Sequence, residues 1–461
     1  MASRRPQSLS SPALTAGRLQ IDAFDDCAFD GTSQPLALST KAESAAESNS
    51  AAAGKSIWVS LVNGEQLHMR HLVPADAGAD AQSFSDDKNV QFESQLNQSL
   101  QGRSAFLLHG EVECGRIYSD GAERGLAHYL LARGCEVFIA DLGGRGGSLV
   151  PSPLKNSELD INTLVTEAIP AMLDAAAVHS VLRAGAGPDV WVGHGFGAVL
   201  LAATWARLDA ARRTAKQWVF FAGRRRFGAA RRSTALFTRL FCHPLIQRWV
   251  SWRKVLPATR LGLGSADENA AWYRCYANWI STSQWRCDDG FDYLAALKRA
   301  PAPPTLHLAA SDDPLFCNIQ DVREFMHELG QHDARLMLVD TVRGSGRAYS
   351  HLGMLLEPDA EIDVFAPLVE WLSAAQNHEH KANNGAQREK INDLHHAGHR
   401  AGDSPGVHSH PAKTAVQVES YYAAQAAMLE SRRDTPAKAD SRKELRKHRG
   451  GTTAEKLANI L

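Results

Sequence analysis

The feature that most constrains the fold is an alternation, between residues 104 and 375, of short apolar runs with stretches of helical periodicity. The runs are apolar on both faces, which is typical of strands in a parallel sheet that helices cover on both sides. We therefore predict an α/β protein with a mostly parallel, doubly wound sheet. One predicted helix, 159–182, is expected to kink or break at Pro170. The predicted strands are 104–110, 135–142, 189–193, 217–223, 304–310 and 334–340, and the other predicted helices are 125–134, 198–208, 319–330 and 359–375.

Composition divides the chain into a predicted globular domain, 55–375, and two polar ends. Residues 1–54 are rich in Ser and Ala without periodicity, which predicts a disordered leader. Residues 376–461 form a His-rich tail that we expect to be mostly disordered, although 415–432 could form a helix that binds a protein partner. Within the domain, Asn63-Gly64 lies between two β-type runs and predicts a hairpin.

Charge and cysteine content limit the class of partner and the compartment. Fifty basic and 51 acidic residues leave a formal net charge of -1, which favours a small-molecule partner over nucleic acid. The seven cysteines lack C-x-x-C spacing, so neither a disulfide framework nor a structural metal site is expected. The N-terminus lacks the apolar core of a secretory signal, and no window is apolar enough to span a membrane. These features predict a cytoplasmic protein without a metal or other cofactor.

A long insertion separates two of the predicted strands. Residues 224–302 far exceed the usual length of a crossover, are basic at the start and contain several tryptophans. We interpret the insertion as a helical lid over a pocket, with a structural excursion that has its own small core as the alternative. The aromatic and basic character of the insertion suggests a ligand with an apolar body and an anionic end.

A glycine-rich turn, Gly193 to Gly197, connects the strand 189–193 to the helix 198–208. The turn reads Gly-His-Gly-Phe-Gly, which is the motif G-x-S-x-G with glycine in place of the serine. The same residues also fit the dinucleotide fingerprint as Gly193-x-Gly195-x-x-Ala198, and the arginines at 224–226 could accept an NADP 2′-phosphate. Against that alternative, the fingerprint normally occupies the first strand-to-helix turn of its domain.

Five motifs together resemble the α/β-hydrolase family over residues 56–375. They occur in the family's order, on the expected strands and helices. They are His109-Gly110, the run Ala140 to Ser148, the turn Gly193 to Gly197, Asp313 in a Pro-containing turn, and His351 before the last helix.

The resemblance implies a role for each matching residue. Gly195 occupies the position of the nucleophile, and the backbone N–H groups of Glu111 and Phe196 would face an oxyanion. His351 would be the base and Asp313, in preference to Asp312, the acid that orients it. The remaining motif residues are His109, Gly110, Gly193, His194 and Gly197, and two other serines, Ser311 and Ser350, lie near the acid and the base but not on the elbow.

Glycine at position 195 can form no acyl-enzyme, and it relieves the strain that the elbow imposes on any residue with a Cβ. The sequence therefore predicts an esterase- or lipase-like protein with impaired catalysis that keeps a pocket for an acyl or ester-like ligand. Two alternatives stay open: an active hydrolase or lyase that uses His351 and Asp313 without a serine, and an NADP-binding protein.

Overall fold

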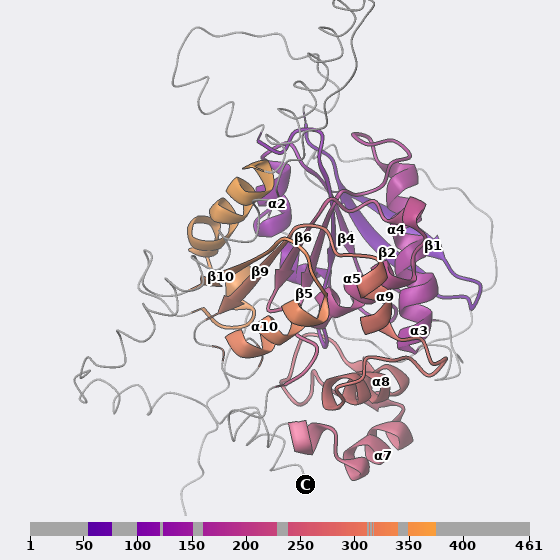
Figure 1. Cartoon of the computed structure of the whole chain (residues 1–461). Coiled ribbons are helices and arrows are strands. Elements are labelled where there is room, and N and C mark those ends of the chain that lie inside the picture. Colours follow the sequence, from indigo (N-terminus) through magenta and orange to yellow (C-terminus); the bar gives the residue numbers. More distant parts are fainter. Residues whose placement is uncertain are drawn as a thin grey trace, which may run out of the picture.

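An eight-stranded sheet forms the centre of the molecule (Figure 1). The computed structural model describes residues 54–75, 99–119, 123–150, 160–227, 238–310, 313, 316, 318–339 and 349–374. The predicted leader, apart from Gly54, and the predicted tail therefore lie outside the described residues. The strand order is β1-β2-β4-β3-β5-β6-β9-β10. The strands are β1 (Lys55–Ser60), β2 (Gln66–Leu72), β3 (Ser104–Leu108), β4 (Glu136–Ala140), β5 (Val190–His194), β6 (Gln217–Phe221), β9 (Thr305–Ala310) and β10 (Ala334–Val339).

The pairing confirms the predicted sheet and hairpin. All pairs from β4 to β10 are parallel, whereas β2 pairs antiparallel with both β1 and β4. The turn between β1 and β2 contains Gly64 at a φ of 88°, a left-handed conformation that glycine adopts without strain. Because the strands from β4 to β10 are parallel, their carboxyl ends meet along one edge of the sheet, where loops can form a site.

Helices cover both faces of the sheet, as predicted. Alternate residues of a strand therefore pack into two different hydrophobic cores, one on each face. Along β3, Phe106 and Leu108 belong to one core, and Ala105 and Leu107 to the other. Figure 1 shows α2 and the C-terminal helical segment on one side and α3, α4 and α9 on the other. The elements involved are η1 (Gly115–Tyr118), α2 (Leu126–Leu131), α3 (Ile161–Thr163), η3 (Leu164–Ala168), α4 (Ile169–His179), α5 (Phe196–Arg207), η4 (Ala210–Arg212), α10 (Ile319–Glu328), α11 (Gly353–Leu356), and η6 (Glu361–Phe365) continued by residues 366–374.

The helix Ile161–His179 continues through Pro170, so the break expected there is absent. A π-helical turn, η3, comes just before Pro170, which is the second residue of α4. The missing N–H of proline thus falls at a wider turn, where the hydrogen-bond pattern already changes. In the described part of the chain, this is the one helix that is long and apolar enough to cross a membrane, and half of its apolar window is buried inside the protein. Core helices meet the same criterion.

Two helices of the insertion, α7 and α8, lie beyond the carboxyl edge of the sheet, whereas its last helix, α9, packs beside α5. Figure 1 shows α7 and α8 beneath the strands, on the side away from α2. Its elements are α7 (Pro244–Arg253), β7 (Val255–Leu256), β8 (Glu268–Asn269), α8 (Ala270–Ser281) and α9 (Tyr293–Arg299). Trp279 and Trp285 are buried with Phe325 in the main core, so part of the tryptophan cluster is structural. Trp272 belongs to the same core and also lines a cavity.

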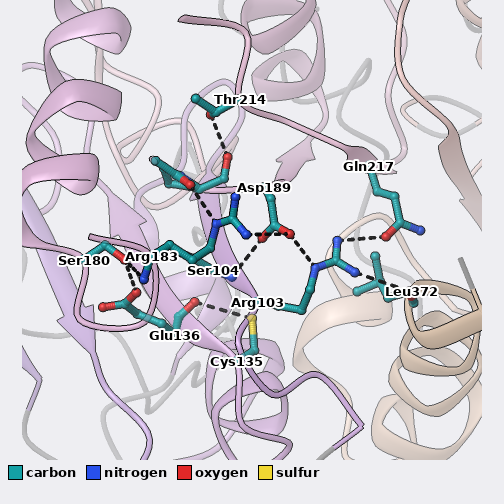
Figure 2. A network of polar contacts seen from close by, with 12 residues as sticks. Arg103, Ser104, Cys135, Glu136, Ser180, Arg183, Asp189, Thr214, Gln217 and Leu372 are labelled. Atoms are coloured by element: carbon teal, nitrogen blue, oxygen red, sulfur yellow. Dashed lines mark hydrogen bonds and ion pairs between the residues drawn. The ribbon is translucent and has the colours of Figure 1, made fainter. Parts of the chain in front are cut away.

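A buried polar network holds the opposite, amino edge of the sheet together (Figure 2). Asp189, before β5, accepts hydrogen bonds from Arg103 Nε at 2.7 Å and from the Ser104 N–H at 2.9 Å. Arg103 also donates to Gln217 at the start of β6 and to the Leu372 carbonyl of the last helix. The network therefore connects β3, β5, β6 and the C-terminal helix far from the carboxyl edge.

Candidate functional site

The chain passes from β5 to α5 through one residue, Gly195. Its φ of 52° and ψ of -121° place it in a conformation that costs about 1–3 kcal/mol for a residue with a side chain. Its N–H donates to the Phe221 carbonyl of β6 at 2.8 Å, which fixes the turn at the carboxyl edge of the sheet. The local geometry is that of a strained strand-to-helix elbow occupied by glycine.

The glycines around the elbow are small because other backbone segments approach them. A Cβ on Gly193 would lie 2.6 Å from the Cα of Ala198, and one on Gly197 would lie 2.4 Å from the His109 carbonyl oxygen. A Cβ on Gly110 would meet the His194 carbonyl oxygen at 2.7 Å. The pattern Gly-x-Gly-x-Gly thus allows α5 to pack directly against the ends of β3 and β5.

The structure brings the predicted acid and base together beside the elbow. Asp313 Oδ2 lies 3.2 Å from His351 Nδ1 in an ion-pair contact. Burial raises the pKa of Asp313, but the hydrogen bond and charge of His351 outweigh burial and hold that pKa below its usual range. A Cβ on Gly195 would lie 3.5 Å from His351 Nε2, so the imidazole faces the nucleophile position. The competing residues Asp312 and Ser311 lie outside the described residues, and Ser350 Oγ accepts a hydrogen bond from the Gly353 N–H, as a turn serine does.

The side chain of Glu111 fills the space that a nucleophile would use. Its Oε2 lies 2.7 Å from the position of a Cβ on Gly195 and accepts a hydrogen bond from the Phe196 N–H at 2.8 Å. The N–H of Glu111 itself also lowers the pKa of this carboxyl. The backbone N–H groups of Glu111 and Phe196, which were assigned to an oxyanion, therefore both interact with the Glu111 carboxylate.

Two side chains from distant segments hold the other oxygen of Glu111. Arg224 Nη2, just after β6, donates to Oε1 at 3.0 Å, and Tyr276 Oη from α8 donates at 2.9 Å. Burial raises the pKa of Glu111, but Arg224, His351 and the backbone donors outweigh burial and lower that pKa to about 2. Glu111 is therefore ionised at neutral pH.

Sequence reasoning missed these side-chain roles. It assigned only the backbone of Glu111, and it assigned the arginines at 224–226 to an anionic ligand. That assignment is wrong for Arg224 and Arg225, because both side chains are fully buried and form ion pairs with Glu111 and Glu328. The one local signal was a carboxylate directly after His109-Gly110.

The two histidines of the motifs are buried. Burial and the charge of Arg145 lower the pKa of His109 to about 4, and its ring connects the Gly110 carbonyl to the Leu142 N–H. Burial and the charge of His351 lower the pKa of His194 to about 3, and its ring centroid lies 4.4 Å from that of His351. Both rings are therefore neutral at pH 7 and support the loops around the site.

A cavity of about 240 Å³ opens beside Glu111 and His351. Most of its wall is apolar, with three carboxyl groups among the polar exceptions: Glu111, Glu113 and Glu268. Burial raises the pKa of Glu113 and of Glu268, each to about 7. The aromatic residues that line the cavity are Phe241, Trp272, Tyr273, Tyr276 and Phe316.

The insertion is clamped to the loop that carries Glu111. Val112 has a φ of 51°, a strained value for a β-branched residue. Its N–H donates to Glu268 Oε1 at 2.7 Å, and its carbonyl accepts from the Ala266 N–H at 2.9 Å. Arg145, which follows β4, pairs with Glu268 and donates to the Gly110 carbonyl at 3.0 Å. These contacts fix the position of the loop relative to the elbow.

Comparison with known proteins identifies the family. The model of the alpha/beta hydrolase family matches residues 105–364, which is more than half of the chain. The chain belongs to the alpha/beta hydrolase family. The predicted resemblance and fold class are thereby confirmed. None of the curated proteins matches this α/β hydrolase.

Solved structures similar to this α/β hydrolase include three enzymes or enzyme domains. An esterase from Exiguobacterium antarcticum is 12% identical, with a TM-score of 0.43 over 69% of this chain and 99% of that one. A Pyrococcus furiosus esterase is 11% identical, with a TM-score of 0.40 over 70% and 90%. A thioesterase domain from the curacin biosynthetic pathway is 14% identical, with a TM-score of 0.38 over 69% and 99%.

The geometry of this α/β hydrolase disfavours the dinucleotide alternative. The elbow follows the third parallel strand along the chain, β5, and not the first. Arg224 and Arg225, two of the three arginines proposed for a 2′-phosphate, are buried in ion pairs. In the described part of the chain, no group of three or more His, Cys, Asp or Glu side chains could hold a metal ion.

Proposed function

We propose that this α/β hydrolase binds a small apolar molecule of the acyl or ester type beside His351, without efficient acyl transfer at the elbow. The observation that carries the proposal is the carboxylate of Glu111 at the nucleophile position, bound by the Phe196 N–H. We also infer a cytoplasmic protein, because Cys135, Cys242, Cys275 and Cys287 of the described residues are free thiols.

Acyl transfer needs a nucleophile and an empty pair of donors for the negative charge of the transition state. Gly195 supplies no hydroxyl, and Glu111 already occupies the donor site. A carbonyl oxygen that became an oxyanion there would approach a fixed negative charge. Loss of a single oxyanion donor costs about 10²–10³ in kcat, so an occupied donor site is a second barrier in addition to the missing serine.

The remaining parts of the site suit ligand binding. The cavity is mostly apolar and has a few convergent polar groups, as small-molecule sites commonly have. Arg224 and Tyr276 hold Glu111 in place, so the elbow end of the cavity is fixed before any ligand arrives. Preorganisation of this kind reduces the entropic cost of binding.

One observation favours a second candidate, an active hydrolase or lyase without a serine. His351 keeps its contact with Asp313 and lines the cavity, so it could take a proton from water or from a substrate. Such an enzyme would lose its turnover with His351→Ala, whereas a binding protein has no turnover to lose.

Hydrolysis of acetyl and butyryl nitrophenyl esters tests the proposal. We expect no turnover above buffer for the protein as written or for Glu111→Ala, and little for Gly195→Ser, because Glu111 still occupies the donors. The double variant Gly195→Ser/Glu111→Ala should turn over at least about 10²-fold faster than Gly195→Ser and show an acyl-enzyme burst.

Removal of Glu111 leaves Arg224 buried without its carboxylate, which typically costs about 3–5 kcal/mol. Circular dichroism must therefore show that the double variant is folded, and addition of Arg224→Met provides a version without the unpaired charge. Turnover by the protein as written that disappears in His351→Ala would reject the binding role in favour of the second candidate. Equal activity of Gly195→Ser and the double variant would show that Glu111 does not obstruct the site.

A further inference from the structure

The three carboxyl groups that line the cavity differ in their partners. Glu111 is paired with Arg224, and Glu268 with Arg145. Among the described residues, no ion pair joins Glu113 to a basic side chain; its Oε2 accepts a hydrogen bond from Ser265 Oγ at 2.6 Å. When all three carboxyl groups are ionised, the cavity wall therefore carries one negative charge that no neighbouring arginine balances.

Glu113 lines the cavity and is buried, so its charge acts strongly on a group in the cavity. The residue is 6% exposed, so water screens its charge poorly. Burial raises the pKa of Glu113 to about 7, with smaller effects from Ser265, His351 and Glu111. An ionised carboxylate in such surroundings is costly unless an opposite charge lies close to it.

The rest of the wall also suits a cation. Neither lysine nor arginine is among the described residues that line the cavity, where His351 is the one basic side chain. Five aromatic residues line it, and arginines already lie over two of them: Arg145 is 4.6 Å from the ring centroid of Trp272, and Arg224 is 5.4 Å from that of Phe316. The other three include Tyr273 and Tyr276. The faces of such rings attract ammonium groups, and an anion would instead meet the carboxylates.

We infer that the ligand of this cavity has an apolar body and a cationic, ammonium-type end that lies against Glu113 and the aromatic wall. The inference rests on the proposed function, because it names the class of ligand that the cavity would bind. It replaces the anionic end expected from the arginine-rich start of the insertion, since Arg224 and Arg225 are used in ion pairs.

Calorimetric titration with three probes of equal chain length tests the charge preference. The probes are hexyltrimethylammonium, 1-hexanol and hexanoate, titrated into the full chain at about pH 8, where Glu113 is mostly ionised. We expect the cation to bind about tenfold more tightly than the alcohol, and hexanoate to bind more weakly than both.

Two variants separate the charge of Glu113 from its structural contact. Glu113→Gln keeps the shape and an acceptor for Ser265, so it should abolish the preference for the cation while the alcohol still binds. Ser265→Ala removes the hydrogen bond but keeps the carboxylate, so the preference should persist. Glu370→Gln, an exposed change in the C-terminal helix, alters the net charge equally and should have no effect.

The outcomes distinguish this inference from the proposed function. If the alcohol binds as tightly as the cation, if hexanoate binds tightest, or if Glu113→Gln leaves the preference intact, the cationic end is wrong and the ligand pocket remains. If none of the three probes binds, both the inference and the proposed ligand pocket fail.

Discussion

At the scale of single residues, the arrangement around Gly195 depends on groups that are far apart in the sequence. Arg224 and Tyr276 lie 113 and 165 residues from Glu111 in the chain, yet both contact the same carboxylate oxygen. Motif order allowed the approach of Asp313 to His351 and the identity of the elbow residue to be predicted. The orientation of the Glu111 side chain could not be predicted, because the motif specifies only a backbone N–H at that position.

The low pKa of Glu111 predicts an acid-dependent loss of stability. This pKa is about 2 in the folded protein, compared with an ordinary value of 4.5 in the unfolded chain. Because the folded pKa is the lower one, the contribution is present above pH 4.5 and is lost as the pH falls toward 2. The shift corresponds to about 3 kcal/mol. We expect the free energies of unfolding of the protein as written and of Glu111→Gln to converge by about this amount between pH 7 and pH 2.

Urea unfolding at a series of pH values measures this convergence. The other carboxyl groups are common to both proteins, so their titrations cancel in the difference. A difference that stays constant with pH would mean that the pKa of Glu111 is ordinary and that the donors do not hold it as a carboxylate.

At the scale of elements, burial pattern and glycine position account for most of what could be predicted. The central strands β3, β4, β5, β6 and β9 were recognisable because both of their faces are buried. The helix α5 was recognisable because it is apolar and follows directly on the glycine-rich elbow. The π-helical turn before Pro170 was not recognisable, because it depends on packing against neighbouring elements and not on local propensity. That Trp272 also lines the cavity, whereas Trp279 and Trp285 do not, follows from the path of the insertion, which composition does not encode.

The close approach of α5 to β3 predicts that Gly197→Ala destabilises the protein. Alanine normally favours a helix over glycine by about 1 kcal/mol, but here its Cβ would lie 2.4 Å from the His109 carbonyl oxygen. Backbone atoms cannot rotate away as a side chain can, so we expect a net loss of about 1–3 kcal/mol in urea unfolding. A gain in stability would show that β3 and α5 separate easily.

At the scale of the whole molecule, the two edges of the sheet have different tasks. The amino edge carries the network of Arg103 and Asp189 that joins three strands to the last helix (Figure 2). The carboxyl edge carries the elbow, Glu111 and the cavity. The alternation of strands and helices predicted this polarity, because parallel strands bring all their carboxyl ends to one side.

This separation predicts that stability and ligand binding can be changed independently. Asp189→Ala leaves the buried guanidinium of Arg103 without its carboxylate, which should lower the free energy of unfolding by about 3–5 kcal/mol. At temperatures where the variant is folded, the affinity for hexyltrimethylammonium should be unchanged. Thermal unfolding and calorimetry together check this, and a parallel loss of affinity would mean that the two edges are coupled.

The position of the Glu111 carboxylate also restricts how this chain could change over generations. With a serine at position 195, the carboxylate would lie 2.7 Å from the new Cβ, so the carboxylate would have to shift from its present place. A change to serine alone would meet an occupied site, and loss of Glu111 alone would leave Arg224 without its carboxylate partner. Each single change is therefore unfavourable, so the residues at positions 111 and 195 constrain each other in any variant of this chain.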